Sequence, residues 1–137
     1  FGTLMDFDAV RNAGSMAGSA GVIVMDEDTC MVQVCLRLIR FYAHESCGQC
    51  TPCREGCNWM EMLLYRIEKG EAQMSDLDVF QSLPPRIGGR TLCALGDAAC
   101  GPAESMLKKF RDEFEHHITH KTCKVNGHRL LANVGGH

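Results

Sequence analysis

Apolar residues recur every three or four positions through most of this chain, which is the spacing of helices that bury one face. The first such run covers residues 30 to 43. A second run begins after Thr51, a suitable N-cap, and Pro52, whose missing N–H costs nothing in a first helical turn, and it stops at Gly70. The predicted buried faces consist of Met31, Cys35, Leu38, Ile39 and Tyr42, and of Cys53, Cys57, Met60, Leu64 and Ile67.

Two further helices are expected in the second half of the chain. Ser75 can cap a short helix that must end at Pro84 and Pro85, because proline cannot donate the helical hydrogen bond. Pro102 then opens a last long helix, whose apolar face reaches Ile118. Four helices with short connections predict a mainly α fold, a four-helix bundle over residues 28–120.

The first 27 residues have a different character. They are rich in Gly, Ala and Ser and end in a β-branched run, residues 21–25, which has no helical period. We interpret residues 1–27 as the end of a small β-containing domain and residues 121–137 as a tail. Because the chain opens at Phe1 in the middle of this pattern, we expect it to be a fragment of a longer protein.

Composition narrows the possible functions. The net charge of −3 does not favour binding to nucleic acid, which requires an excess of basic residues. No apolar run approaches the roughly 20 residues that span a bilayer, so membrane contact would come only through partners. Nine cysteines are present, of which Cys35 and Cys57 fall on apolar helix faces and are expected to be reduced core residues. Cys30, Cys100 and Cys123 are scattered without a second ligand spacing.

The remaining four cysteines form the most specific motif. Cys47, Cys50 and Cys53 have C-x2-C-x2-C spacing, which bends one short loop around a single centre, and the distant Cys93 can complete a set of four thiolates. This set predicts a [4Fe-4S] cluster and an electron carrier. Structural zinc is the first competitor, but zinc modules usually pair two C-x2-4-C knuckles, whereas here three cysteines share one turn.

Residues around this loop suit a cluster. Gly48 has no Cβ and allows backbone N–H groups to approach the sulfurs, and Cys53 lies in the first turn of a helix whose positive end favours thiolate. Arg54 is either a cation beside the sulfurs or an exposed first-turn arginine. His44 could tune the potential, although a solvent-facing residue at a helix end is the simpler interpretation.

A histidine group lies near the end of the last predicted helix. His116 and His120 have the i, i+4 spacing of a metal pair, with His117 between them and Cys123 close by. The pair lacks the glutamate that zincins carry between their histidines, so we interpret the group as a solvated helix end that complements the dipole.

The cluster loop resembles that of a known family. Its segment is similar to the flavin-containing, NADH-oxidising subunit of respiratory complex I, also shared by NAD-reducing hydrogenases and NAD-dependent formate dehydrogenases. The similarity runs from about residue 2 to about residue 118. The segments that carry it are 14–26, 41–56, 90–93 and 110–114.

The resemblance implies a fold and a reaction. The chain would be the C-terminal portion of that subunit, a helical bundle preceded by the tail of an α/β, ubiquitin-like β-grasp domain. NADH and FMN would bind upstream, and the cluster on Cys47, Cys50, Cys53 and Cys93 would pass electrons to other iron–sulfur subunits, including a [2Fe-2S] thioredoxin-like subunit, and finally to quinone. The subunit would be peripheral, on the cytoplasmic or matrix side of the inner membrane.

Other functions stay open at the level of sequence. The chain could belong to a hydrogenase or formate dehydrogenase relative, it could be a standalone ferredoxin-like carrier, or it could be an interaction module stabilised by zinc. No residue here can be assigned to NADH or FMN, because Gly14, Gly18 and Gly21 precede a strand-like run, whereas a phosphate-binding glycine loop follows a strand.

Overall fold

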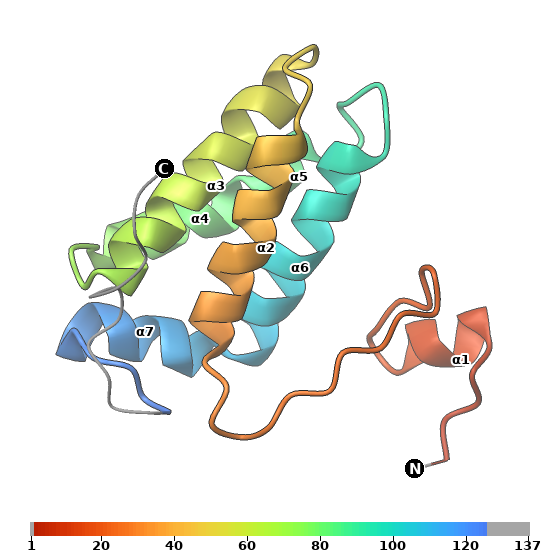
Figure 1. The fold of residues 1–137 in the computed structure, drawn as a ribbon, viewed down its shortest axis with the longest axis horizontal. Coiled ribbons are helices and arrows are strands. Elements are labelled where there is room, and N and C mark those ends of the chain that lie inside the picture. The colour runs from red at the N-terminus through yellow and green to blue at the C-terminus, as the bar shows by residue number, and fades with distance from the viewer. Residues whose placement is uncertain (1, 126–137) are drawn as a thin grey trace.

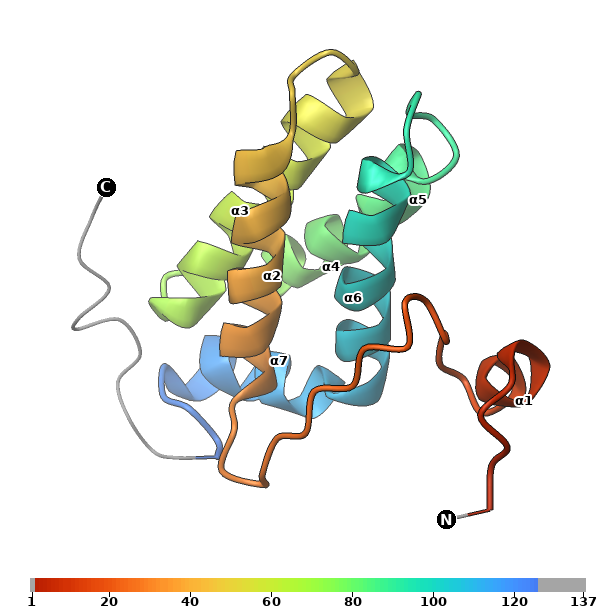
Figure 2. The ribbon, with the colours of Figure 1, turned by 45° about the vertical axis from the view of Figure 1, so that its right-hand side comes forward.

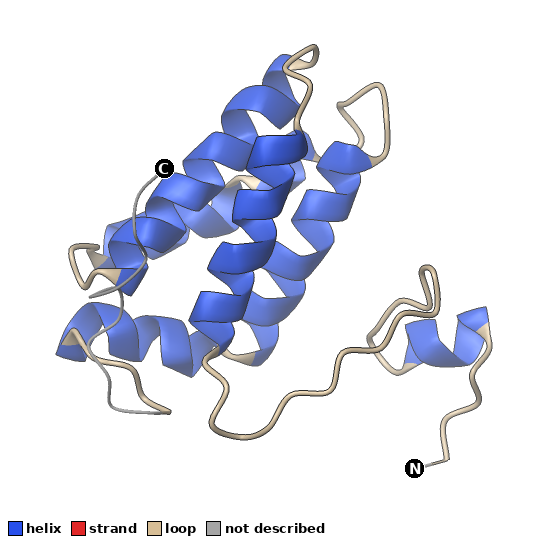
Figure 3. Ribbon diagram, in the orientation of Figure 1, coloured by secondary structure: helices blue, strands red, loops and turns tan. Residues whose placement is uncertain are grey.

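A computed structural model describes residues 2–125, and within this range every regular element is a helix (Figure 3). Among these helices, none combines the length and apolarity needed to cross a bilayer. The elements in chain order are α1 Phe7–Asn12, α2 Met31–Glu45, α3 Thr51–Glu68, α4 Met74–Ser82, α5 Pro84–Ile87, α6 Leu95–Lys109 and α7 Arg111–His120.

Helices α2 and α3 form an antiparallel hairpin at the centre of the bundle (Figures 1 and 2). Both predicted apolar stripes are largely confirmed, because Cys35, Ile39, Met60, Leu64 and Ile67 are all fully buried. On α2 the buried face is wider than predicted and also includes Val32 and Leu36. Helix α6 packs against α2, and the shorter helices α4, α5 and α7 pack on α3.

The ends of α3 follow from its sequence with a shift of one residue. The N-cap is Cys50, not Thr51, and Pro52 lies in the first turn as expected. At the other end Gly70 adopts a φ of +68°, a left-handed conformation that glycine adopts without steric cost and that ends the helix. The predicted extent of this helix is therefore confirmed.

The predicted cap of the short helix was wrong. Helix α4 is capped by Gln73, whose side chain and that of Asp76 satisfy each other's backbone N–H groups in a capping box. Ser75 lies inside the first turn. The expected stop is confirmed: α4 ends at Ser82, and Pro84 and Pro85 occupy the first positions of α5, where a missing N–H removes no helical bond.

The prediction that Pro102 opens the last helix was also wrong. Pro102 lies in the middle of α6, which starts seven residues earlier at Leu95. Gly101 precedes it, and because glycine has no Cβ, it relieves the clash that a proline ring imposes on the residue before it. The expected single helix is instead broken at Phe110, where φ is −127° and ψ is 30°, and α7 continues after it.

The predicted strand over residues 21–25 is not formed. Residues 21–26 are an irregular segment in which Val22, Ile23 and Val24 are 73%, 77% and 89% exposed. A strand needs a neighbour for its backbone N–H and C=O groups, and residues 2–125 supply none. Helix α1 likewise buries no residue, and both lie beside the bundle (Figure 2).

A substitution at Gly56 would test how closely α3 packs against α5. A Cβ on Gly56 would lie 2.5 Å from both Cγ1 and Cδ1 of the buried Ile87. We expect Gly56→Ala to lower the free energy of unfolding by about 1–2 kcal/mol, since overpacking outweighs the gain in helix propensity. Urea denaturation measures the change.

Gly101 provides the matched control, because a Cβ there meets nothing within 4 Å. Gly101→Ala should change stability by less than about 1 kcal/mol, since the propensity gain and the restriction before Pro102 oppose each other. If wild type and Gly56→Ala unfolded at the same urea concentration, Ile87 would have to move aside without cost.

Candidate iron–sulfur centre

The four predicted ligands lie on two loops and one helix start. Cys47 is exposed in the loop between α2 and α3, Cys50 is half-buried as the N-cap of α3, and Cys53 is buried in its first turn. Cys93 is exposed in the loop that joins α5 to α6. Both loops are at the same end of the bundle (Figure 1).

A hydrogen bond joins the two loops. The backbone N–H of Leu92 donates to Sγ of Cys50 at 3.4 Å, across 42 positions of sequence. The adjacent Cys93 is held in turn by Thr91, whose hydroxyl donates to the Cys93 carbonyl at 2.8 Å. The structure thus brings the segment of the remote cysteine against the C-x2-C-x2-C loop. N–H bonds to cysteine sulfur are one of the means by which proteins set the potential of iron–sulfur clusters.

The loop conformation depends on Gly48. Its φ is +79°, which a residue with a Cβ rarely adopts. Arg54 holds this turn: its guanidinium donates to the Gly48 carbonyl at 2.6 Å and to Glu55 at 2.8 Å. The structure therefore gives Arg54 a role beyond the two that were predicted, in which a half-exposed side chain fixes the loop backbone.

The positive end of α3 faces the predicted cluster ligands. Cys50 caps the helix and Cys53 follows in the first turn, where unpaired backbone N–H groups favour negative charge. The Ser46 hydroxyl lies 3.3 Å from Sγ of Cys53. His44 points away from this environment: its side chain is 84% exposed and pairs with Glu45, in agreement with the solvent-facing interpretation.

The donor set fits a cluster better than a single ion. In residues 2–125, Cys47, Cys50, Cys53 and Cys93 contribute no trio of sulfurs within 4.8 Å of one another. Four ligands that each bind a different iron of a cubane stand farther apart than four that bind one zinc ion. Four thiols on converging loops beside a helix N-terminus therefore suit a [4Fe-4S] cluster.

The neighbouring Cys57 is a core residue, as predicted. It is fully buried one turn after Cys53, and burial raises the pKa of its thiol to about 12. Cys35 is equally buried, and burial also raises its thiol pKa to about 12. Both thiols therefore stay protonated at neutral pH and pack as apolar groups.

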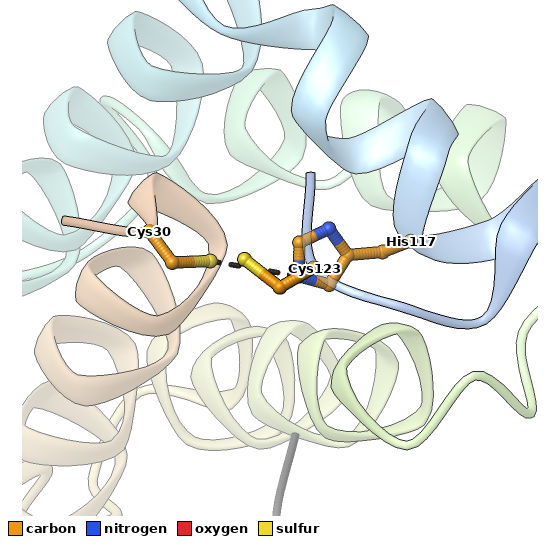
Figure 4. Close-up of side chains that lie close together, drawn as sticks. All are labelled: Cys30, His117 and Cys123. Atoms are coloured by element: carbon orange, nitrogen blue, oxygen red, sulfur yellow. Dashed lines mark hydrogen bonds between the residues drawn. The ribbon is translucent and has the colours of Figure 1, made fainter. Parts of the chain in front are cut away.

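The histidine group divides into two environments. His116 and His120 stack with ring centroids 4.2 Å apart, and His120 is exposed at the end of α7, as the solvated interpretation predicts. For His117 that interpretation was wrong, because its side chain is buried with Cys30 and Cys123 (Figure 4). Burial lowers the pKa of His117, so its neutral form is favoured.

Sequence reasoning missed this second group because its members have no common spacing. Cys30 precedes α2, whereas His117 lies in α7, 87 residues away, and Cys123 lies just after that helix. The available signal was weak: a cysteine six positions after a histidine that lies on the apolar side of its helix.

The geometry defines the class of protein: a helical module with a cysteine-rich loop suited to an iron–sulfur cluster. A sequence model of the NADH-ubiquinone oxidoreductase-F iron–sulfur binding region matches residues 33–117. The chain belongs to this family.

Named relatives agree with this assignment. The chain is 52% identical over 119 residues to the second NADH-quinone oxidoreductase F subunit of Rhizobium meliloti, an alignment that covers 87% of the chain and 28% of the relative. It is 50% identical to the NADH-quinone oxidoreductase F subunit of Streptomyces coelicolor, and the alignment covers 93% of the chain and 28% of that relative. It is 46% identical to the mitochondrial NADH-ubiquinone oxidoreductase 51 kDa subunit of Neurospora crassa, and the alignment covers 94% of the chain and 26% of that relative. The chain thus spans little more than a quarter of their length.

Arg54 should control the mobility of the cysteine loop. We expect Arg54→Ala to speed amide hydrogen exchange at residues 48–50 about 5- to 10-fold, because a hydrogen bond from a charged donor stabilises by about 1.5 kcal/mol. Mass spectrometry of peptides after timed deuterium exchange measures this.

Arg40 offers the matched control. Its guanidinium donates to Glu61 at 3.0 Å, linking α2 to α3 without touching the loop. Arg40→Ala should leave exchange in the loop unchanged. If both variants exchanged like wild type, the bond from Arg54 to Gly48 would have no part in ordering the loop.

Proposed function

We propose that Cys47, Cys50, Cys53 and Cys93 bind a [4Fe-4S] cluster through which this chain transfers electrons within an NADH:quinone oxidoreductase. The observation that carries the proposal is the bond from the Leu92 N–H to Cys50, since it joins the loop of Cys93 to the three-cysteine loop. Membership of the iron–sulfur binding region family supports it independently.

The bound cluster supplies one-electron chemistry between NADH-reduced flavin and the iron–sulfur groups of other subunits. The residues of this chain position the cluster and set its environment. Gly48 and Arg54 shape the loop, and the start of α3 directs backbone N–H groups at the ligands. Of these features, the helix start stabilises negative charge on the cluster, and the other two hold the loop in shape.

The cluster would lie at an accessible surface. Cys47 and Cys93 are exposed. Leu92, the residue before Cys93, is 87% exposed despite its apolar side chain. We propose that this edge faces an electron-transfer partner, and that a [2Fe-2S] thioredoxin-like subunit is among the partners of the complex.

NADH and FMN would bind in the part of the longer protein that precedes this chain, as the length of the relatives suggests. Residues 1–27 would then be the end of the β-grasp domain. Val22, Ile23 and Val24 would form a strand once upstream strands provide hydrogen-bond partners and cover their exposed side chains. The whole enzyme would act as a peripheral module on the cytoplasmic or matrix side of the inner membrane.

A hydrogenase or formate dehydrogenase relative is the second candidate from the sequence. No structural observation favours it, and the named relatives are NADH-quinone and NADH-ubiquinone oxidoreductase subunits. A zinc module built on the same four cysteines is disfavoured because three of them share one short loop, whereas zinc modules usually pair two C-x2-4-C knuckles.

Replacing the remote ligand tests the ligand set. Cys93→Ser should lose the cluster or convert it to a form with less iron, because an alkoxide binds iron less well than a soft thiolate does. Iron and acid-labile sulfide analysis would measure this, together with paramagnetic resonance after NADH is added to the enzyme that contains this chain.

Cys57→Ser is the matched control, since Cys57 lies one helical turn after Cys53 but is fully buried in the core. It should retain iron, sulfide and the paramagnetic signal. Loss of the cluster in Cys57→Ser, with retention in Cys93→Ser, would refute the assignment. A protein that keeps its iron–sulfur content but shows no signal with NADH would instead refute the electron-transfer role.

A further inference from the structure

A second set of soft ligands lies away from the cysteine loop. Sγ of Cys30, Sγ of Cys123 and one ring nitrogen of His117 are all within 4.8 Å of one another, and all three residues are buried (Figure 4). They come from three places: the residue before α2, the last helix α7 and the segment after it. A direct hydrogen bond joins Sγ of Cys30 and Nε2 of His117, at 3.5 Å.

His117 is oriented as a metal-binding histidine would be. Its Nδ1 lies 2.7 Å from the Glu113 carbonyl, and because a carbonyl only accepts, Nδ1 carries the proton. Nε2 therefore presents its lone pair to the two cysteines. Metal-ligating histidines usually have this arrangement, in which one ring nitrogen donates to a carbonyl or carboxylate and the other binds the metal.

Glu68 supplies an unpaired oxygen beside this nitrogen. Its Oε1 accepts from Gln33 at 2.9 Å, but its Oε2 has no hydrogen-bond partner and lies 3.7 Å from Nε2 of His117. The Glu68 side chain is fully buried. Leaving a buried carboxylate oxygen without a partner is costly, and a cation beside it removes that cost.

We propose that Cys30, His117, Cys123 and Glu68 form a structural zinc site. Two thiolates, an imidazole and a carboxylate are all established zinc ligands, and four of them make a closed tetrahedral site. With Zn–S of about 2.3 Å and Zn–N of about 2.05 Å, tetrahedral geometry places S and N about 3.5 Å apart. The distance from Cys30 to His117 has this value before any metal is added.

The charges of the site also suit a divalent cation. Two thiolates and one carboxylate carry three negative charges, which burial without a cation would not permit. Zinc reduces this to a single negative charge. Helix α2 begins at Met31, directly after Cys30, so its positive end lies at the site. The two thiol protons leave to solvent when the metal binds.

The site would cross-link the helix ends at the end of the bundle opposite the cysteine loop. It joins the start of α2 to the end of α3, where Glu68 is the last residue, and to the end of α7. The turn after α3 also contacts the turn after α7, because a Cβ on Gly70 would lie 3.0 Å from Cβ of Lys121. From Cys53 to Glu68, α3 extends about 22 Å, so the two sites are separate.

Metal analysis of the unmodified protein tests the site directly. We expect one zinc per chain in addition to the cluster iron. The X-ray absorption spectrum at the zinc edge should show two sulfur and two nitrogen or oxygen ligands, with Zn–S near about 2.3 Å. A zinc-free protein, iron in this site, or a Cys30–Cys123 disulfide detected by mass spectrometry would overturn the proposal.

Variants assign the ligands. Cys30→Ser and Cys123→Ser should lower zinc occupancy at least about tenfold, and Glu68→Gln should weaken zinc binding about tenfold, measured by transfer to a chromophoric chelator. Cys35→Ser, a buried cysteine on the same helix as the site, should keep its zinc. Cys47→Ser should lose iron and retain zinc. Full zinc occupancy in a Cys30→Ser/Cys123→Ser double variant would refute the site, and if that variant fails to fold, the absorption spectrum of the unmodified protein decides.

Discussion

The bundle depends on the packing of α3, because α2, α4, α5, α6 and α7 all contact it. Cys57, Met60, Leu64 and Ile67 form a continuous, fully buried stripe along this helix. Gly56 extends the stripe with a position so close to α5 that no larger residue fits without movement. Helix α3 is therefore the element around which the other helices pack, and each of its ends lies at one of the two proposed sites.

The two ends of α3 offer contrasting surroundings to the two proposed sites. At the start, the helix presents unpaired N–H groups to thiols on accessible loops, a setting in which thiolates form and exchange electrons. At the end, Glu68 points into a buried group of donors where solvent has no access. Exposure suits electron transfer, whereas burial suits a permanent structural role. Along α3, about 22 Å separates Cys53 from Glu68.

The sequence was a good guide to the two central helices and to the cysteine loop, whereas the Ser75 cap and the helix start at Pro102 were wrong. The periodicity of α2 and α3 predicted their buried faces, and the C-x2-C-x2-C spacing with Cys93 predicted which cysteines would lie on converging loops. The boundaries of α6 were not predictable in this way. The helix continues through Pro102 because Ala99, Cys100 and Ala103 are buried against neighbouring helices, and it breaks only at Phe110. The run at residues 21–25 has strand propensity, but propensity forms no strand without a partner.

The group around His117 shows why the rest could not be predicted. Its residues are adjacent only because α7 turns back across the ends of α2 and α3, and no spacing rule encodes that turn. Burial is what distinguishes His117 from its neighbours His116 and His120, and burial is a property of the fold. The nine cysteines therefore divide by location: four lie on two neighbouring loops and the start of α3, three pack inside the core, and Cys30 and Cys123 meet where the ends of three helices converge. If both proposed sites are occupied, they restrain opposite ends of α3, so loss of either should loosen its own end first. The effects on stability should add, because the sites are too far apart to share partners.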